Sequence, residues 1–448
     1  MKTFSLRQSL LLTAAVVAIT GFSTTAEAAY GQTGFFTGRV QPDGSINLRD
    51  PVSASPNGAV AGQTIAQRPR PEYDPIPIDV GSFQMFPSIE AGVVFDSNIY
   101  SQQQSTADVA WIAQPALTFF SNWNRHALSF GAQADFGLYT DHWGENYRDG
   151  LLNMRGRFDL ANRTYINYGA DYQRLTEARG SPDNIAQATP IEYNYYRFYT
   201  GGLRKQGRVS LEGQYAVRRF DYDPLQTAAG GEINLNFRNR FIHTAEGKLE
   251  YEVMRFWQPF VKGTYNWRDF EANAPQNSQG FDAVFGSGFE FSGGKFTGEA
   301  YAGYMSQDYR NWNNADGAGN TTSDFKFGGN LLWNITGLTS LAMEADRTLE
   351  DTLTTGYRSF ISTGGSFTAQ HELRRNILLE GKAGFTRYDF NGAPNRQDDQ
   401  FNAGAGVRYF FNRHFYSDLQ YDFDNRISSI GAFNYDRHVA QLRFGAQM

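Results

Sequence analysis

The chain of 448 residues lacks cysteine, has only 6 histidines, and beyond residue 29 contains no apolar stretch long enough for a membrane-spanning helix. Without cysteine it forms no disulfide framework, no thiolate metal site and no lipid-anchored N-terminus. The histidines are scattered singly, without zinc-binding spacing, and no Gly-x-Ser-x-Gly sequence occurs. We therefore predict no catalytic residues, no metal site and no cofactor, and a protein that is not an enzyme.

The chain also has little excess charge and a low average hydrophobicity. Its formal net charge is -6, and 41% of its residues are hydrophobic, yet 15% are aromatic and 46 are glycine. A mildly acidic chain without a basic stripe is not expected to bind nucleic acid. Low hydropathy with many aromatic residues is typical of a closed transmembrane barrel, in which alternate residues face lipid and water.

The first 80 residues divide into two segments. Lys2 and Arg7, an apolar run at 10–19 and small residues at 26–28 predict a secretory signal peptide over residues 1–29. Residues 30–80 are rich in proline and glycine, which disfavour helices and central strands. We interpret them as a disordered or extended periplasmic linker, with a plug lodged inside a barrel as the alternative.

From residue 81 to 448 the hydrophobic period is two. In residues 128–138, Leu128, Phe130 and Phe136 alternate with Ser129 and Asp135, which separates an apolar face from a polar face. Strands this long suit a tilted bilayer crossing. A soluble sandwich or propeller is the alternative, but it predicts shorter strands and no aromatic crowding at strand ends.

The connections between strands are of two alternating kinds, short turns and longer polar loops. Short turns are predicted at 122–125, 161–163, 204–207, 254–257, 292–295, 336–338, 374–376 and 412–414. Short periplasmic turns and longer outer loops are typical of outer-membrane barrels. We predict an all-β fold, a closed antiparallel up-and-down transmembrane barrel of about 18 strands, preceded by the disordered periplasmic segment.

Charged residues that alternate with the apolar ones are predicted to face the lumen. Charges on the lipid face cost about 2–4 kcal/mol for Lys or Arg at mid-bilayer, so the interior is the favourable place for them. The pore-lining candidates are Glu212, Arg218, Glu246, Lys248, Glu250, Glu252, Lys262, Arg268, Glu299, Glu344, Asp346, Glu380, Lys382, Arg408, Asp418 and Asp422. The alternative is a lumen closed by salt bridges or by a plug.

Residues 68–100 resemble the opening of a proteobacterial family of outer-membrane β-barrel porins, the β-barrel porin 2 type. The resemblance rests on Arg-Pro-Arg-Pro-Glu-Tyr-Asp-Pro at 68–75, Gly-Ser-Phe at 81–83, Pro87, and Phe-Asp-Ser-Asn-Ile-Tyr at 95–100. The chain has Ser97 where the family commonly has a second acidic residue. The resemblance implies a location in the cell outer membrane and, for some members, export of exopolysaccharide or capsular polysaccharide; it carries over no catalytic residues.

The function predicted from these observations is an outer-membrane channel that serves as a conduit for exported polysaccharide. A general small-solute porin and a structural or docking barrel without transport stay open as alternatives. The expected partners are outer-membrane lipid and lipopolysaccharide, the barrel-insertion machinery and a periplasmic polysaccharide-export protein.

The division between linker and barrel is testable by deletion. Removal of residues 30–65 is expected to leave a folded barrel, whereas removal of residues 86–100 takes away the first strand and prevents ring closure. Heat-modifiable mobility on gels measures the folded fraction, and equal loss in both deletions would contradict the division.

Overall fold

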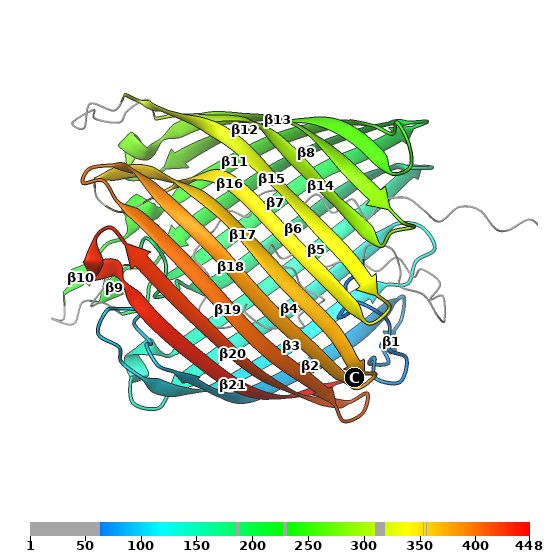
Figure 1. Cartoon of the computed structure of the whole chain (residues 1–448), viewed down its shortest axis with the longest axis horizontal. Helices are drawn as coiled ribbons and strands as arrows, with labels where there is room; N and C mark the ends of the chain where they lie inside the picture. The colour runs from blue at the N-terminus through cyan, green and yellow to red at the C-terminus, as the bar shows by residue number, and fades with distance from the viewer. Residues whose placement is uncertain (1–62, 185–188, 227–230, 310–318, 353, 355) are drawn as a thin grey trace, which may run out of the picture.

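The protein folds as one closed antiparallel β-barrel of 18 strands (Figure 1). The computed structural model describes residues 63–184, 189–226, 231–309, 319–352, 354 and 356–448. The signal-peptide prediction and residues 30–62 of the predicted linker lie outside the described residues.

The barrel strands follow one another around the ring in sequence order. They are β2 (Phe83–Asp96), β3 (Asp108–Ser121), β4 (Ala127–Tyr139), β5 (Tyr147–Ala161), β6 (Thr164–Thr176), β7 (Glu192–Gln206), β8 (Val209–Tyr222), β11 (Arg240–Tyr251), β12 (Trp257–Phe270), β13 (Ser278–Phe291), β14 (Phe296–Asp308), β15 (Thr321–Thr336), β16 (Thr339–Asp351), β17 (Tyr357–Arg374), β18 (Ile377–Gly392), β19 (Gln397–Phe410), β20 (Phe415–Ser428) and β21 (Tyr435–Gln447). The last strand pairs with the first, with Leu442 opposite Val93, and this pairing closes the ring.

Short strands and 3-10 turns lie at the two ends of the barrel. The short strand β1 (Ile78–Val80) forms a hairpin with β2. Strands β9 (Leu225–Gln226) and β10 (Glu232–Ile233) pair within an outer loop. In the part of the chain that the structure describes, single 3-10 turns occur in four outer loops: η1 (Trp143–Glu145), η2 (Asn236–Arg238), η3 (Ala274–Gln276) and η4 (Gly431–Phe433). Among the described residues, no helix is long and apolar enough to cross a membrane.

Each strand separates an apolar outer face from a polar inner face. On β20, Leu419 and Tyr421 are exposed on the outside, whereas Asp418, Gln420 and Asp422, which alternate with them, are buried. The pleat produces this separation because successive side chains point to opposite faces of a sheet. The outer face presents apolar side chains to lipid, and the inner face gathers the charged and polar ones together with buried apolar clusters such as Val94, Ile112 and Val439.

The predicted short turns connect strands at one end of the barrel. Two of them require the left-handed backbone conformation that glycine adopts most easily: φ is +59° at Gly207 and +67° at Gly293. The longer loops lie at the other end, as the alternation of short and long connections predicted. Both chain ends of the barrel are therefore on the short-turn, periplasmic side.

The described part of the predicted linker differs from the expectation of a flexible segment. Residues 63–74 pack against the inner rim of the periplasmic mouth, where Ile65, Arg68 and Arg70 are buried. Their partners lie roughly 270–370 residues away in sequence, so composition alone could not reveal them. Residues 63–74 are therefore docked on the rim of the mouth.

A charge placed on the outer face should destabilise the barrel more than the same charge placed inside. Ala302 lies at mid-strand on the outer face of β14, opposite Phe285. Ala302→Arg is expected to lower the free energy of unfolding by about 2–4 kcal/mol. Equilibrium unfolding in lipid vesicles measures this change.

Thr264→Arg is the matched control for that substitution. Thr264 faces inward beside Glu246, which accepts a hydrogen bond from its hydroxyl at 3.4 Å, so a new guanidinium there has a carboxylate partner. Equal destabilisation by both substitutions would contradict the assignment of the faces.

Candidate functional site: the barrel lumen

The inner face of the barrel carries a network of ion pairs that links neighbouring and more distant strands. The structure places the predicted charged residues on this face. On β11 to β14, Lys248 lies 3.2 Å from Glu299 and 3.7 Å from Glu250, and Lys262 lies 4.0 Å from Glu246. Lys248 and Glu299 come from strands separated by two others, so their side chains reach over the inner wall to meet.

A second group of ion pairs bridges the seam where the ring closes. Glu90 of β2 lies 3.4 Å from Arg443 of β21 and 3.6 Å from Arg408 of β19, and Arg408 also pairs with Asp418. The tyrosine hydroxyl of Tyr416 donates to Glu90 at 2.6 Å. Glu90 and Arg443 were absent from the predicted set, although both alternate with apolar neighbours and the same period-two signal identifies them.

Most of the other predicted residues also have identified partners. Lys382 pairs with Asp422 at 2.9 Å, Glu252 with Lys205 at 2.7 Å, and Arg268 with Asp351. The Arg218 guanidinium donates to the Thr244 hydroxyl at 3.3 Å, and the Gln370 amide donates to Glu380 at 2.7 Å. Glu212 faces Lys248 across the β8–β11 register.

Glu344 and Asp346, like Glu212, make no ion pair within 4.0 Å in the described part of the chain, but unlike Glu212 they have no cation as a register partner. They are adjacent on the inner face of β16, and their register partners on β15 and β17 are uncharged: Asn330, Gly328, Ser366 and Gly364. Lys326, whose charge acts on Asp346, is itself paired with Asp282 at 2.8 Å. The two carboxylates therefore leave a negative patch on the inner wall.

The connection between β6 and β7 folds over the outer mouth instead of extending away from it. The Asp183 carboxylate accepts hydrogen bonds from Thr352 at 2.5 Å and Thr354 at 3.0 Å, both on the nearly opposite β16–β17 connection. The carbonyl oxygen of Gly180 accepts a hydrogen bond from Arg426 of β20. Residues 177–184 thus cross the mouth and are held on its far side.

A buried ion pair fixes the start of this crossing segment. Glu177 lies 2.9 Å from Arg238, and both side chains are almost fully buried. Burial raises the pKa of Glu177, and the positive charge of Arg238 opposes this increase. Arg238 also donates to the carbonyl oxygen of Asp183 at 2.7 Å, so one guanidinium joins two points of the segment.

A cavity of about 100 Å³ lies beneath the crossing segment. Glu177 and Arg179 line it from above, and charged residues of β18 to β21 line the opposite side, among them Lys382, Asp422 and Arg437. Both signs of charge therefore meet around this cavity in the outer mouth.

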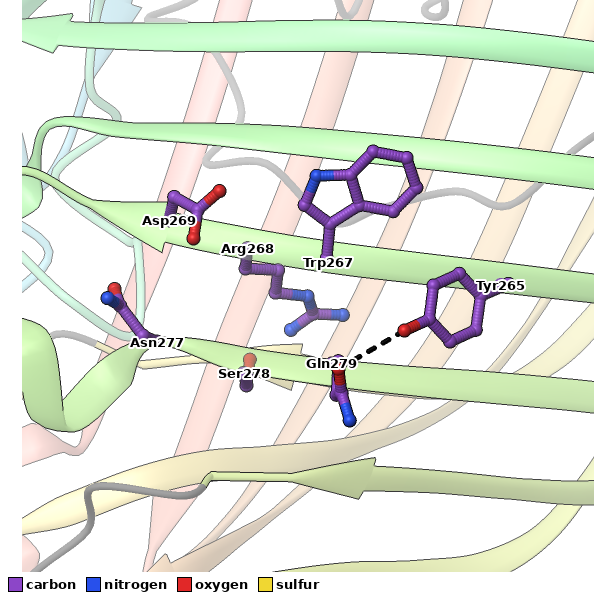
Figure 2. A pocket seen from close by; sticks show the side chains of 7 residues that line it. All are labelled: Tyr265, Trp267, Arg268, Asp269, Asn277, Ser278 and Gln279. Atoms are coloured by element: carbon purple, nitrogen blue, oxygen red, sulfur yellow. Dashed lines mark hydrogen bonds between the residues drawn. The ribbon is translucent and has the colours of Figure 1, made fainter.

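A larger hollow of about 410 Å³ lies between β12 and β13 beside lipid-facing aromatic residues (Figure 2). Tyr265 and Trp267 alternate with inward-facing residues and belong to the outer face, and the Tyr265 hydroxyl donates to Gln279 at 3.2 Å. This hollow is lined on the outer face by Tyr265 and Trp267, which belong to the aromatic girdle at the outer rim, and Arg268, which pairs with Asp351, also lines it.

A closed ring of tilted strands with an apolar outer face and a charged inner face defines an outer-membrane β-barrel. The model of the family described as Putative beta-barrel porin 2 matches residues 70–448. The chain belongs to this family, and its location is the cell outer membrane. No significant match was found among curated proteins.

Several solved structures are similar in fold at low sequence identity. The outer membrane protein OpdK from Pseudomonas aeruginosa aligns with a TM-score of 0.41 at 10% identity, covering 81% of this chain and 98% of that one. Pseudomonas aeruginosa OccK8 (OprE) aligns with a TM-score of 0.44 at 9% identity, covering 82% and 98%. The siderophore receptor PiuA from Acinetobacter baumannii aligns with a TM-score of 0.44 at 10% identity, covering 83% and 82%.

Removal of the Asp183 carboxylate should release the crossing segment. Asp183→Ala eliminates the acceptor for both threonine hydroxyls, and hydrogen bonds to a charged group contribute about 1.5–3 kcal/mol each. Amide hydrogen exchange of residues 177–184 is expected to accelerate roughly tenfold or more. Asp221→Ala is the control, because Asp221 pairs with Arg219 at the rim; equal acceleration in both variants would show that Asp183 does not hold the segment.

Proposed function

We propose that the protein is a diffusion channel of the outer membrane for small hydrophilic solutes, with a preference for cations, and that it is not an enzyme. The observation that carries this proposal is the inner face, which carries ion pairs on β11 to β14 and at the seam of the ring and is crossed at the outer mouth by residues 177–184. A polar lumen in an 18-stranded ring is wide enough to hold water between its walls.

The preference for cations follows from the way the inner charges are paired. Lysine and arginine side chains such as Lys248, Lys382 and Arg408 are neutralised by carboxylates. Glu344 and Asp346 have no such partner among the described residues and face the lumen together. An uncompensated pair of carboxylates raises the local concentration of cations and repels anions.

Export of polysaccharide is less well supported by the geometry. Residues 177–184 span the outer mouth and residues 63–74 occupy the periplasmic rim, whereas a long polymer needs a continuous wide path. No comparison supports polysaccharide as cargo. The expected partners, namely lipopolysaccharide, the insertion machinery and a periplasmic export protein, stay predictions.

Ion selectivity in a planar bilayer tests the proposal. With a KCl gradient across the membrane, the reversal potential is expected to have the sign of cation preference. Glu344→Gln together with Asp346→Asn should lower the cation-to-anion permeability ratio by up to about fivefold per charge, since a unit charge at 4 Å in water is worth about 1 kcal/mol.

Asp269→Asn is the control, because Asp269 lies on the outer face and its loss should leave the ratio unchanged. Anion preference in the unaltered protein would contradict the proposed selectivity. Absence of conductance, both in the unaltered protein and after deletion of residues 63–74, would contradict the channel itself.

A further inference from the structure

Residues 63–74, which we call the rim segment, make specific hydrogen bonds to the inner rim of the periplasmic mouth. The backbone N–H of Ile65 donates to the Ser340 hydroxyl and that of Ala66 donates to the Gln370 side chain, each at 3.0 Å. The Arg68 guanidinium donates to Asn334 at 2.8 Å and to the carbonyl oxygen of Gly337. Side chains of β15, β16 and β17 therefore hold the rim segment by hydrogen bonds.

An ion pair anchors the middle of the rim segment. Arg70 lies 3.1 Å from Glu372 of β17, and the two side chains are only 4% and 6% exposed. The same guanidinium donates to the carbonyl oxygens of Ile65 at 2.7 Å and Arg68 at 3.1 Å, which folds the segment back on itself. Burial lowers the pKa of Arg70, and the charge of Glu372 opposes this decrease.

An apolar contact completes the docking. Ile65 is 1% exposed and is buried against Leu378, Phe410 and Tyr416 of three successive strands. The ring of Tyr73 packs on Phe410 with a centroid separation of 5.7 Å. The inner rim thus presents a pocket for one aliphatic side chain, a carboxylate for one arginine and amide groups for the backbone.

The rim segment is joined to the barrel differently from the way the strands are joined to one another. The rim segment contributes no strand to the ring, and its contacts with the strands are made through side chains. Arg68 Nε, Arg70 Nε and Asn334 Nδ2 are buried and have no hydrogen-bond partner in the described structure. A buried group without a hydrogen-bond partner costs free energy, and the rim segment lacks the continuous backbone ladder that holds the strands together.

We propose that the inner periplasmic rim is a peptide-binding site, that its occupant is the chain's own rim segment, and that release of this segment widens the aqueous path. The inference rests on the proposed channel function. The site selects a peptide with an aliphatic residue followed at short distance by arginines, as in Ile65, Arg68 and Arg70. Docking lowers conductance and undocking raises it.

A reversible cross-link tests this inference. Because the native chain has no cysteine, the reagent reacts only with the introduced thiols. Ala66→Cys and Gln370→Cys place two thiols where a backbone N–H now meets a side chain. A short bis-thiosulfonate reagent joins them through two disulfides, with one sulfinate released at each thiol, and a reductant cleaves the link. Single-channel recording of the linked protein is expected to show only the lower conductance level. Cleavage of the link should restore transitions to a higher level.

The matched control places the same reagent away from the rim. Ser306 and Ser323 are direct partners on β14 and β15, with their exposed hydroxyls 2.8 Å apart. Linking Ser306→Cys to Ser323→Cys should leave conductance unchanged.

Disruption of the ion pair provides an independent variant. Glu372→Gln leaves Arg70 buried without its carboxylate, and the fraction of time at the higher level is expected to rise roughly tenfold or more. The exchange of both charges, Arg70→Glu with Glu372→Arg, should reverse part of that rise. This reversal separates loss of docking from a general loss of barrel stability.

The outcomes discriminate between the inference and the channel proposal. Equal conductance in the linked and cleaved protein would overturn the inference and make the rim segment a fixed brace, while the channel proposal stands. A folded variant without residues 63–74 that conducts no ions would overturn the channel proposal, and the inference with it.

Discussion

The structure depends on one constraint: in lipid, every backbone N–H and C=O must find a partner within the sheet. An open edge cannot exist there, so the last strand has to pair with the first, as it does between Leu442 and Val93. Once the ring closes, the pleat assigns every side chain to lipid or to the lumen. The apolar belt, the charged interior and the position of both chain ends on one side follow from this closure.

The charged interior has its own requirement, because charges withdrawn from bulk water need partners. Most inner cations obtain carboxylates from strands other than their own, such as Lys248 with Glu299 and Arg443 with Glu90. These ion pairs connect different strands across the inner face, and their charged groups keep that face hydrophilic. Segments from both ends of the barrel use the same chemistry: Arg238 holds the outer crossing segment through Glu177, and Glu372 holds the rim segment through Arg70.

Features that repeat locally along the chain could be predicted from the sequence. Alternation identified the strands and their inner charges, and the turn residues identified the hairpins, so the ring of 18 strands was predictable. Local patterns do not encode contacts between distant residues. Nothing near Ile65 signals that it meets Leu378, and nothing in the β6–β7 connection signals that Asp183 reaches Thr352. The rim segment was for this reason expected to be flexible, and the crossing segment was expected to be an ordinary outer loop.

The central claim is that water reaches the inner face and lipid covers the outer one. Cysteine scanning along β16, in a chain without native cysteine, tests it most directly. In sealed lipid vesicles, a charged thiol reagent small enough to enter the lumen should modify Glu344→Cys and Asp346→Cys but not Met343→Cys or Ala345→Cys. Equal modification at all four positions, or modification only at 343 and 345, would contradict the account.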